Sequence, residues 1–397
     1  MHFADRLPRL GTESAFEVSR QALEWQSKGH TVYPFHLGDL NIPTPENIVE
    51  AMNRAIRDGR TGYCPPAGIP ELRAALAEDV GKRRGLTYGA ENVAIQPGGK
   101  PLIGKFILAF MNGGDEVLYP NPGYPIYESQ IEFHGGVAVP YTYRESEQGF
   151  RIDLDEIRSK ITPRTRLLIT NNCHNPSGAE SPPEELEGLA EVALEHDLWV
   201  LSDEAYFEIR YAGESTSIAS LPGMQERTVV LYTFSKKFAM TGWRLGAAIA
   251  SRDVIEVIAE LNVNAESCSN HFIQWAMIEA LTGPQEGPSR ILDILRERRD
   301  VAGPRLQSID GIRVTIPQTT FYLFPNVTEV VKRKGSDNIS SFQQATLEET
   351  GVAFCTRNHF GRPQPGETEC YIRFAYSGID IPDIEKGLSI LKDYFEA

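Results

Sequence analysis

Two cations of different character lie within residues 235–246, which read SKKFAMTGWRLG. The amine of Lys236 is a nucleophile that can condense with an aldehyde to form a Schiff base. The guanidinium of Arg244 is a planar, two-pronged donor that suits a phosphate better than the point charge of a lysine does. An amine and a fixed cation at this spacing are what a phosphorylated aldehyde cofactor requires. The alternative interpretation is a surface lysine pair beside a buried tryptophan and an ordinary arginine.

A second candidate anion site lies at residues 96–101, which read QPGGKP and lead from an apolar run into a helical pattern. Gly98 and Gly99 let the backbone approach an anion closely, and the free N–H groups at a helix start attract it. The lysine-serine pair of a nucleotide P-loop and the third glycine of a dinucleotide fingerprint are both absent, so neither of those sites is predicted. A glycine turn without a ligand is the alternative.

Composition bounds the class of protein. The chain has 397 residues, of which 41% are hydrophobic and 23% charged, so it is globular and long enough for two domains. Its net charge of −15 argues against a nucleic-acid or anionic-membrane surface, where clustered positive charge is expected. We therefore expect small-molecule partners, with no nucleic acid and no membrane.

The five cysteines are odd in number and form no Cys-x-x-Cys pair. This usage is typical of a reducing compartment rather than of a disulfide framework or a zinc site, and no metal site is predicted. No opening apolar segment looks like a signal peptide, and no apolar run is long enough to cross a bilayer. We expect a cytoplasmic protein.

Short β-rich apolar runs alternate with amphipathic stretches from about residue 50 to residue 285. The runs that predict strands are residues 91–96, 116–119, 166–170, 198–202, 228–233 and 245–250. This alternation predicts an α/β fold with a parallel sheet covered by helices on both faces. Between two of these strands, residues 181–184 read SPPE and predict a capping box with a proline at the first helical position.

Both termini are less regular than the central part of the chain. We expect residues 1–47 and 289–397 to combine as a smaller α+β domain, and residues 48–288 to form a large ligand-binding domain. Neither an internal repeat nor a flexible linker interrupts this division.

With these features assembled, residues 235–246 closely resemble the lysine signature of the class I/II aminotransferases, the fold-type I enzymes that depend on pyridoxal 5'-phosphate (PLP). The closest pattern is that of bacterial aspartate aminotransferases. The resemblance selects Lys236, rather than Lys237, as the Schiff-base lysine. It implies PLP as cofactor and a mostly parallel, seven-stranded sheet between helices in the large domain.

The resemblance also implies how the cofactor ring is held. Asp203 would pair with the pyridine nitrogen and keep the ring protonated, so that the ring accepts electrons from a neighbouring carbanion. Tyr206 and Asn175 would donate to the phenolic oxygen and lower the Schiff-base pKa, so that an incoming amine can exchange. Tyr124 would stack on the ring. The alternative for each residue is an ordinary core or turn position.

The cofactor phosphate would be held by the QPGGKP turn and the lysine segment together. The resemblance implies main-chain donors at Gly98, Gly99 and Lys100, and the hydroxyls of Thr233 and Ser235 beside the guanidinium already described. Tyr63 matches a tyrosine that reaches the phosphate of the neighbouring subunit, which implies a homodimer with shared active sites.

For the substrate, Arg373 matches the arginine that clamps the α-carboxylate, and Gly38 matches a glycine near the substrate. Asn175 and Lys100 would contribute as well, because Lys100 stands where the bacterial subgroup holds the distal carboxylate of an acidic substrate. Two loops depart from the family pattern, at residues 319–322 and 356–361. We expect Arg357 or His359 in the second loop either to add a contact to that carboxylate or to admit another side chain.

These residues together predict a PLP-dependent transaminase, with Lys236, Asp203 and Tyr206 as catalytic groups. It would move an amino group from an L-amino acid, best aspartate or glutamate, to a 2-oxo acid such as 2-oxoglutarate by a ping-pong mechanism. Another fate of the same carbanion (β-elimination, cyclisation or racemisation) is the alternative, because the cofactor residues do not decide among them. A non-catalytic regulator of the same fold is less expected, because the chain begins in the enzyme-like region and keeps Lys236.

Overall fold

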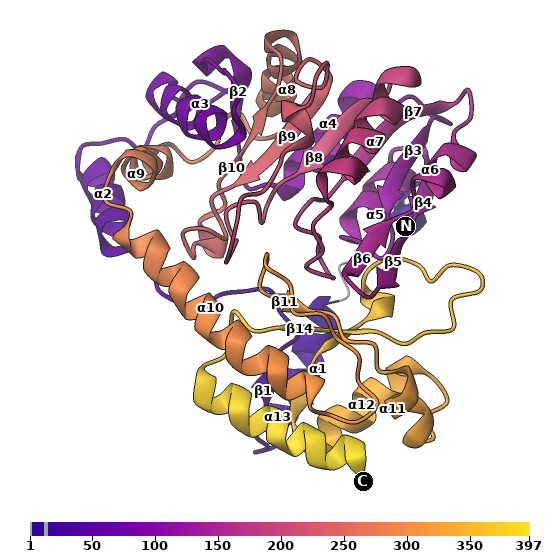
Figure 1. Cartoon of the computed structure of the whole chain (residues 1–397). Helices are drawn as coiled ribbons and strands as arrows, with labels where there is room; N and C mark the ends of the chain where they lie inside the picture. Colours follow the sequence, from indigo (N-terminus) through magenta and orange to yellow (C-terminus); the bar gives the residue numbers. More distant parts are fainter. Residues whose placement is uncertain (1, 12–14) are drawn as a thin grey trace.

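A seven-stranded sheet forms the centre of the upper part of the molecule (Figure 1). The computed structural model describes residues 2–11 and 15–397. The strands lie in the order β2-β10-β9-β8-β7-β3-β4, and every neighbouring pair is parallel except the two pairs that β10 makes. The sheet comprises β2 (Val93–Gln96), β3 (Glu116–Pro120), β4 (Val137–Tyr141), β7 (Thr165–Thr170), β8 (Trp199–Asp203), β9 (Thr228–Thr233) and β10 (Gly246–Ile249).

The predicted α/β fold with a mostly parallel sheet is confirmed, and all six predicted strands are present within two residues of their expected bounds. The strand pattern missed β4. This edge strand is only partly buried, since Val137 is 43% exposed, and it has alanine and proline where apolar β-branched residues would mark a strand.

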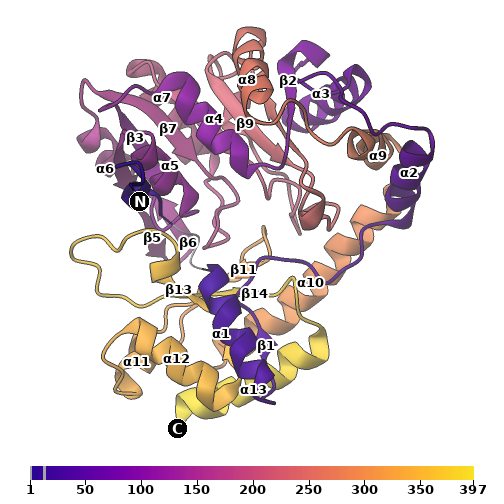
Figure 2. The same ribbon diagram turned by 180° about the vertical axis from the view of Figure 1, so that it is seen from behind.

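Helices cover both faces of the sheet (Figures 1 and 2). Alternation along each strand explains this: Val200 packs in one cluster with α7, whereas its neighbour Leu201 packs in another with α4, α5 and α8. The helices of this part are α2 (Glu46–Arg57), α3 (Pro70–Arg84), α4 (Lys100–Phe110), α5 (Ile126–Phe133), α6 (Leu154–Lys160), α7 (Pro183–Glu195), α8 (Arg252–Ala265) and α9 (His271–Thr282).

The predicted start of α7 is one residue too early, and its predicted cap is wrong. Pro183 is the first helical residue, whereas a capping box at residues 181–184 would place Pro182 there. The N-cap residue, however, is Pro182, which has no side chain able to cap, so no capping box forms. The backbone N–H of Ser181 instead donates to Asn172 Oδ1 at 2.9 Å. The sequence pattern placed the hydroxyl one residue too early, because Pro182 itself takes the extended N-cap conformation.

The lower part combines segments from both ends of the chain (Figure 1). Strand β1 (Tyr33–Pro34) pairs in parallel with β12 (Val352–Ala353), and Phe35 packs with Phe354 and Phe374 in one core. The remaining elements are α1 (Ala15–Ser27), α10 (Glu286–Gln307), α11 (Thr328–Arg333), α12 (Ile339–Thr350), α13 (Ile381–Glu396), β11 (Tyr322–Leu323), β13 (Cys355–Thr356) and β14 (Ile372–Ala375), with the hairpin β5 (Tyr143–Ser146) and β6 (Gly149–Ile152) between the two parts.

The long helix α10 runs from the upper part into the lower one, and the boundary proposed at residue 288/289 falls within its first turn (Figure 1). The domain division stays a prediction. All five cysteines are free thiols. Within the residues that the structure describes, the helices are too short or too polar to cross a membrane.

Candidate active site

The predicted site residues follow three neighbouring strands at their carboxyl ends. Asn175 lies in the loop after β7, Asp203 is the last residue of β8, and Thr233 is the last residue of β9. Strands β7, β8 and β9 are adjacent and parallel, so these loops open at the same edge of the sheet. Such an edge is where ligands bind in α/β sheets of this kind.

Lys236 reaches across to the N-terminal segment. Its Nζ donates to the backbone carbonyl of Gly38 at 2.9 Å and lies 5.8 Å from the ring centroid of Tyr206. Position 38 has no room for a side chain, because a Cβ atom there would lie 2.2 Å from Tyr322 Oη. The glycine predicted near the substrate is therefore also required by packing.

The adjacent Lys237 has different surroundings. It is 9% exposed, and its Nζ lies 3.8 Å from a carboxylate oxygen of Glu208. Burial lowers the pKa of Lys237, and the carboxylate of Glu208 opposes this effect. The two neighbouring amines thus have separate partners, and Lys236 is the one beside Tyr206 and Gly38.

Asp203 is a buried carboxylate, 5% exposed. It accepts hydrogen bonds from the hydroxyl of Tyr127 at 2.5 Å and from the backbone N–H of Ala205 at 3.1 Å. Burial raises the pKa of Asp203 to about 6, against the lowering effect of these two donors. A cation placed beside Asp203 would favour its charged form.

Arg373 comes from β14 of the lower part and meets the loop after β7. Its Nη1 donates to Asn175 Oδ1 at 2.9 Å, and its Nη2 donates to the carbonyl of His36 at 2.8 Å. The guanidinium carbon lies between two rings, 4.3 Å from the centroid of Tyr322 and 4.6 Å from that of Phe360. Among the described residues the buried Nε of Arg373 has no hydrogen-bond partner. The group is thus held in place while its buried Nε–H donor stays unused.

Tyr206 joins this group through its hydroxyl, which lies 2.6 Å from the hydroxyl of Tyr322. Burial raises the pKa of Tyr206 well above its usual value, so this phenol stays protonated and can donate. The structure therefore brings together Lys236, Gly38, Asp203, Tyr206, Asn175 and Arg373.

The glycine turn and Arg244 also converge. Gly98 has a φ of +97°, and a Cβ atom there would lie 2.2 Å from Arg244 Nη2. Arg244 itself adopts the left-handed conformation, with a φ of 57°, and its Nη1 donates to the carbonyl of Thr241 at 2.7 Å. Gly99 is the N-cap residue of α4, so the first N–H groups of that helix lie beside the guanidinium.

The other residues predicted at the phosphate end lie around this turn. The hydroxyl of Thr233 donates to that of Ser235 at 2.9 Å. Lys100 is the exposed first residue of α4, and its Nζ lies 5.6 Å from the ring centroid of Tyr124. Tyr63 stands out by its exposure, because 88% of it is accessible in the single chain.

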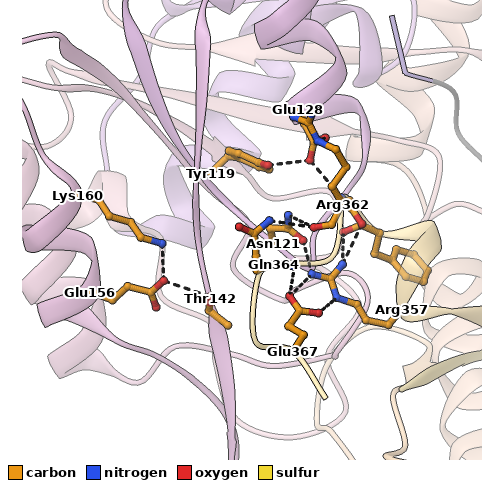
Figure 3. A network of polar contacts seen from close by, with 12 residues as sticks. Tyr119, Asn121, Glu128, Thr142, Glu156, Lys160, Arg357, Arg362, Gln364 and Glu367 are labelled. Carbon is orange, nitrogen blue, oxygen red and sulfur yellow. Dashed lines mark hydrogen bonds and ion pairs between the residues drawn. The ribbon is translucent and has the colours of Figure 1, made fainter. Parts of the chain in front are cut away.

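The two loops that depart from the family pattern have structural partners. Arg357 is 4% exposed and donates to Glu367 and Asn121, so its side chain is engaged by other parts of the protein (Figure 3). The expectation for this loop, which named Arg357 or His359, stays a prediction. His359 Nδ1 lies 2.9 Å from Thr356 Oγ1. In the other loop, the hydroxyl of Thr319 donates to the carbonyl of Gly178 at 2.8 Å, so it holds the turn that follows Asn175.

Sequence reasoning missed three residues of this group. Tyr127 donates to Asp203, Tyr322 lies against Tyr206, and His36 places its carbonyl on Arg373. Burial, together with the charge of Arg373, lowers the pKa of His36 to about 4. Two of them had a signal in the sequence, because Tyr322 ends the loop of residues 319–322 that departs from the family pattern, and Tyr127 lies three residues after the predicted stacking residue Tyr124. No local motif marks His36.

Comparison with known proteins supports a common family. Residues 32–391 match the family model described as aminotransferase class I and II. The chain is 34% identical over 366 residues to a probable aspartate/prephenate aminotransferase of Aquifex aeolicus, covering 91% of this chain and 92% of that protein.

Solved structures agree with this match. The aspartate aminotransferase of Thermus thermophilus with maleate superimposes with a TM-score of 0.90 at 31% identity, covering 99% of each chain. The alanine aminotransferase of Pyrococcus furiosus gives a TM-score of 0.91 at 30% identity, covering 100% of each chain. With a family match over nearly its whole length and a shared fold, the chain belongs to the class I and II aminotransferases, a family of PLP-dependent transaminases.

Proposed function

We propose that this transaminase binds PLP at Lys236 and transfers the amino group of an acidic amino acid to a 2-oxo acid. The observation that carries the proposal is the convergence of one amine, one buried carboxylate and one buried guanidinium on the same edge of the sheet. These groups are Lys236, Asp203 and Arg373. Lys236 matches the cofactor aldehyde, Asp203 matches the ring nitrogen, and Arg373 matches the carboxylate of the substrate.

The residues present fit the cofactor at both of its ends. Arg244, the left-handed Gly98 and the N-terminus of α4 supply positive charge and N–H donors where a phosphate dianion would lie. Among the described residues no cation pairs with the buried carboxylate of Asp203, and burial raises its pKa. A protonated ring nitrogen beside Asp203 would supply that cation, and the two charges would stabilise each other. Tyr124, which follows β3 on the same sheet, is the residue that would stack on the cofactor ring.

When bound, PLP supplies an aldehyde that condenses with amines and a ring that accepts electrons. The chain's own groups supply positioning and proton transfer. Arg373 holds the substrate carboxylate through its planar fork, with Asn175 fixing its orientation. Once the substrate amine has displaced it from the aldehyde, the Nζ atom of Lys236 accepts the proton from the substrate Cα, with the rings of Tyr206 and Phe321 at 5.8 and 5.6 Å beside it. Both half-reactions use one site, so the kinetics are ping-pong.

The choice of substrate is supported by relatives and by one residue. The Aquifex aeolicus protein is named for aspartate and prephenate, whereas the Pyrococcus furiosus structure is of an alanine aminotransferase. Lys100 favours an acidic substrate, because this exposed lysine lies at the start of α4 with its Nζ 5.6 Å from the ring centroid of Tyr124, the proposed stacking residue. A distal carboxylate there would gain a charge-assisted hydrogen bond.

We further propose that the active unit is a homodimer. The match of Tyr63 to the family tyrosine that reaches a neighbouring subunit supports this, and its 88% exposure in the single chain leaves the phenol accessible to a second copy. A second copy would bring this phenol to the phosphate end of its partner's site.

The test is a half-reaction measured without an acceptor. The absorbance of the cofactor-loaded protein is followed as single amino acids are added. Aspartate and glutamate are expected to convert the cofactor completely at low concentration, alanine less readily. Conversion by neither acidic amino acid would reject the substrate assignment, and protein that binds no PLP would reject the whole proposal.

A further inference from the structure

Arg357 is a buried cation that the proposed chemistry does not use. Its Nε and Nη2 atoms each lie 2.7 Å from a carboxylate oxygen of Glu367, and Nη2 also donates to Asn121 Oδ1 at 2.7 Å (Figure 3). Its Nη1 donates to the carbonyl of Gly361 at 3.0 Å. A guanidinium that is only 4% exposed is stable because all of these acceptors are present.

Through Arg357, the loop of residues 356–362 is fastened to the turn of residues 121–124. Asn121 is fully buried, and its Nδ2 donates to the carbonyl of Arg362 at 2.9 Å (Figure 3). Two residues later, the N–H of Gly123 donates to the carbonyl of Phe360 at 2.9 Å. Gly361 has a φ of +101°, and a Cβ atom there would lie 2.9 Å from Asn121 Oδ1. The loop and the turn therefore fit closely, and the turn ends at Tyr124.

The loop of residues 356–362 contacts Arg373 as well as the turn of residues 121–124. The ring of Phe360 lies 4.6 Å from the guanidinium carbon of Arg373. Strand β13, which leads into the loop, pairs with β14 so that Cys355 lies opposite Arg373. The backbone N–H of Arg357 donates to the carbonyl of Tyr371 at 2.8 Å. One short loop thus touches both the proposed carboxylate clamp and the turn that carries the proposed stacking ring.

We propose that Arg357 is a positioning residue that fixes Arg373 relative to Tyr124 by holding this loop on Asn121. The inference rests on the proposed function, which assigns the substrate carboxylate to Arg373 and the cofactor ring to Tyr124. The planar fork of arginine is what the role needs, because it meets the Glu367 carboxylate, the Asn121 amide and a loop carbonyl at once. A lysine keeps the charge but serves fewer acceptors in fixed directions.

The experiment compares Arg357→Lys with the matched control Arg362→Lys. Arg362 lies on the same loop, but its side chain is 63% exposed and pairs with Glu128 (Figure 3) and with Glu132. In cofactor-free Arg357→Lys, amide exchange at Gly123 is expected to accelerate about tenfold. The PLP dissociation constant and the KM for the amino acid are expected to rise about tenfold, with a smaller change in kcat. Arg362→Lys should stay within about twofold of the native protein.

A lower melting temperature with unchanged Gly123 exchange, PLP affinity and KM would reduce Arg357 to a packing residue and overturn the inference. If Arg357→Lys does not fold, Glu367→Gln replaces it, because it keeps the arginine and weakens one partner. The same three readouts should then move in the same direction by a smaller factor, and no movement would again overturn the inference. Native protein that fails to bind PLP would instead contradict the proposed function, while the Gly123 exchange still tests the loop contact.

Discussion

The amine of Lys236 donates a 2.9 Å hydrogen bond to the carbonyl of Gly38, although the two residues are 198 positions apart in the chain. This contact joins the segment after β9 to the N-terminal segment that leads from β1. Because the neighbouring amine of Lys237 lies beside Glu208 instead, the two lysines of one sequence pair face different partners.

The first prediction follows from that difference. Treatment of the PLP-loaded protein with borohydride should attach the cofactor irreversibly to Lys236, as peptide mass analysis would detect. Lys236→Ala should lose both this adduct and turnover, whereas Lys237→Ala should keep the adduct with a modest loss of stability, because it removes one of the two cations paired with Glu208 and leaves Arg83 as the other. An adduct that survives in Lys236→Ala and disappears in Lys237→Ala would reverse the assignment.

The second prediction concerns Asp203 in the cofactor-free protein. Its folded pKa is about 6, against 3.8 for an ordinary aspartate, so folding takes up a proton in this range. The stabilisation is present below pH 4 and is lost as the pH rises through 6, and it amounts to about 3 kcal/mol. Urea unfolding of native protein and Asp203→Asn at a series of pH values measures it.

In that series, the free energy of unfolding of the native protein minus that of Asp203→Asn should fall between pH 4 and pH 6. Taking the difference removes the contributions of His36 and His174, whose pKa values burial lowers to about 4 and about 3. A difference that stays constant across this range would show that Asp203 ionises normally.

The third prediction tests the shared site through Tyr63. Tyr63→Ala and Lys236→Ala should each be weakly active or inactive as separate homodimers. When they are mixed under conditions that allow subunit exchange, part of the activity should return, because one site of each hybrid carries both native residues. A monomer that is fully active at low concentration would rule out the composite site. Mixing Lys236→Ala with itself under the same conditions is the control.

The fourth prediction concerns the acidic substrate. Lys100→Met should raise the KM for aspartate and glutamate much more than that for alanine. Loss of one charge-assisted contact typically costs about 1.5–3 kcal/mol, roughly ten- to a hundred-fold in kcat/KM. Steady-state kinetics with the three amino acids and one common acceptor provide the comparison. Equal losses for acidic and neutral substrates would mean that Lys100 serves only through its backbone N–H.

Patterns short enough to lie on one element determined much of the fold. The six predicted strands were recognisable because each contains a short, mainly apolar run, as a strand covered by helices on both faces requires. The partly exposed edge strand β4 lacks that constraint, and Pro182 took the N-cap position that a hydroxyl residue usually occupies. The missed strand β4 and the wrong N-cap of α7 both lie where the local sequence preference is weak. At these places the surrounding structure determines the backbone conformation.

The sequence by itself also indicated the candidate site, because Lys236 and Arg244 lie on one continuous segment and Gly98 and Gly99 on another. What surrounds those residues was decided only by the tertiary structure. Tyr127 meets Asp203 from 76 positions away, and Arg357 meets Asn121 from 236 positions away. Such contacts depend on the order of strands in the sheet and on how the C-terminal loop crosses the turn after β3. The physical reason is that hydrogen bonds between distant residues form only after packing has brought their segments together, so no local pattern encodes them.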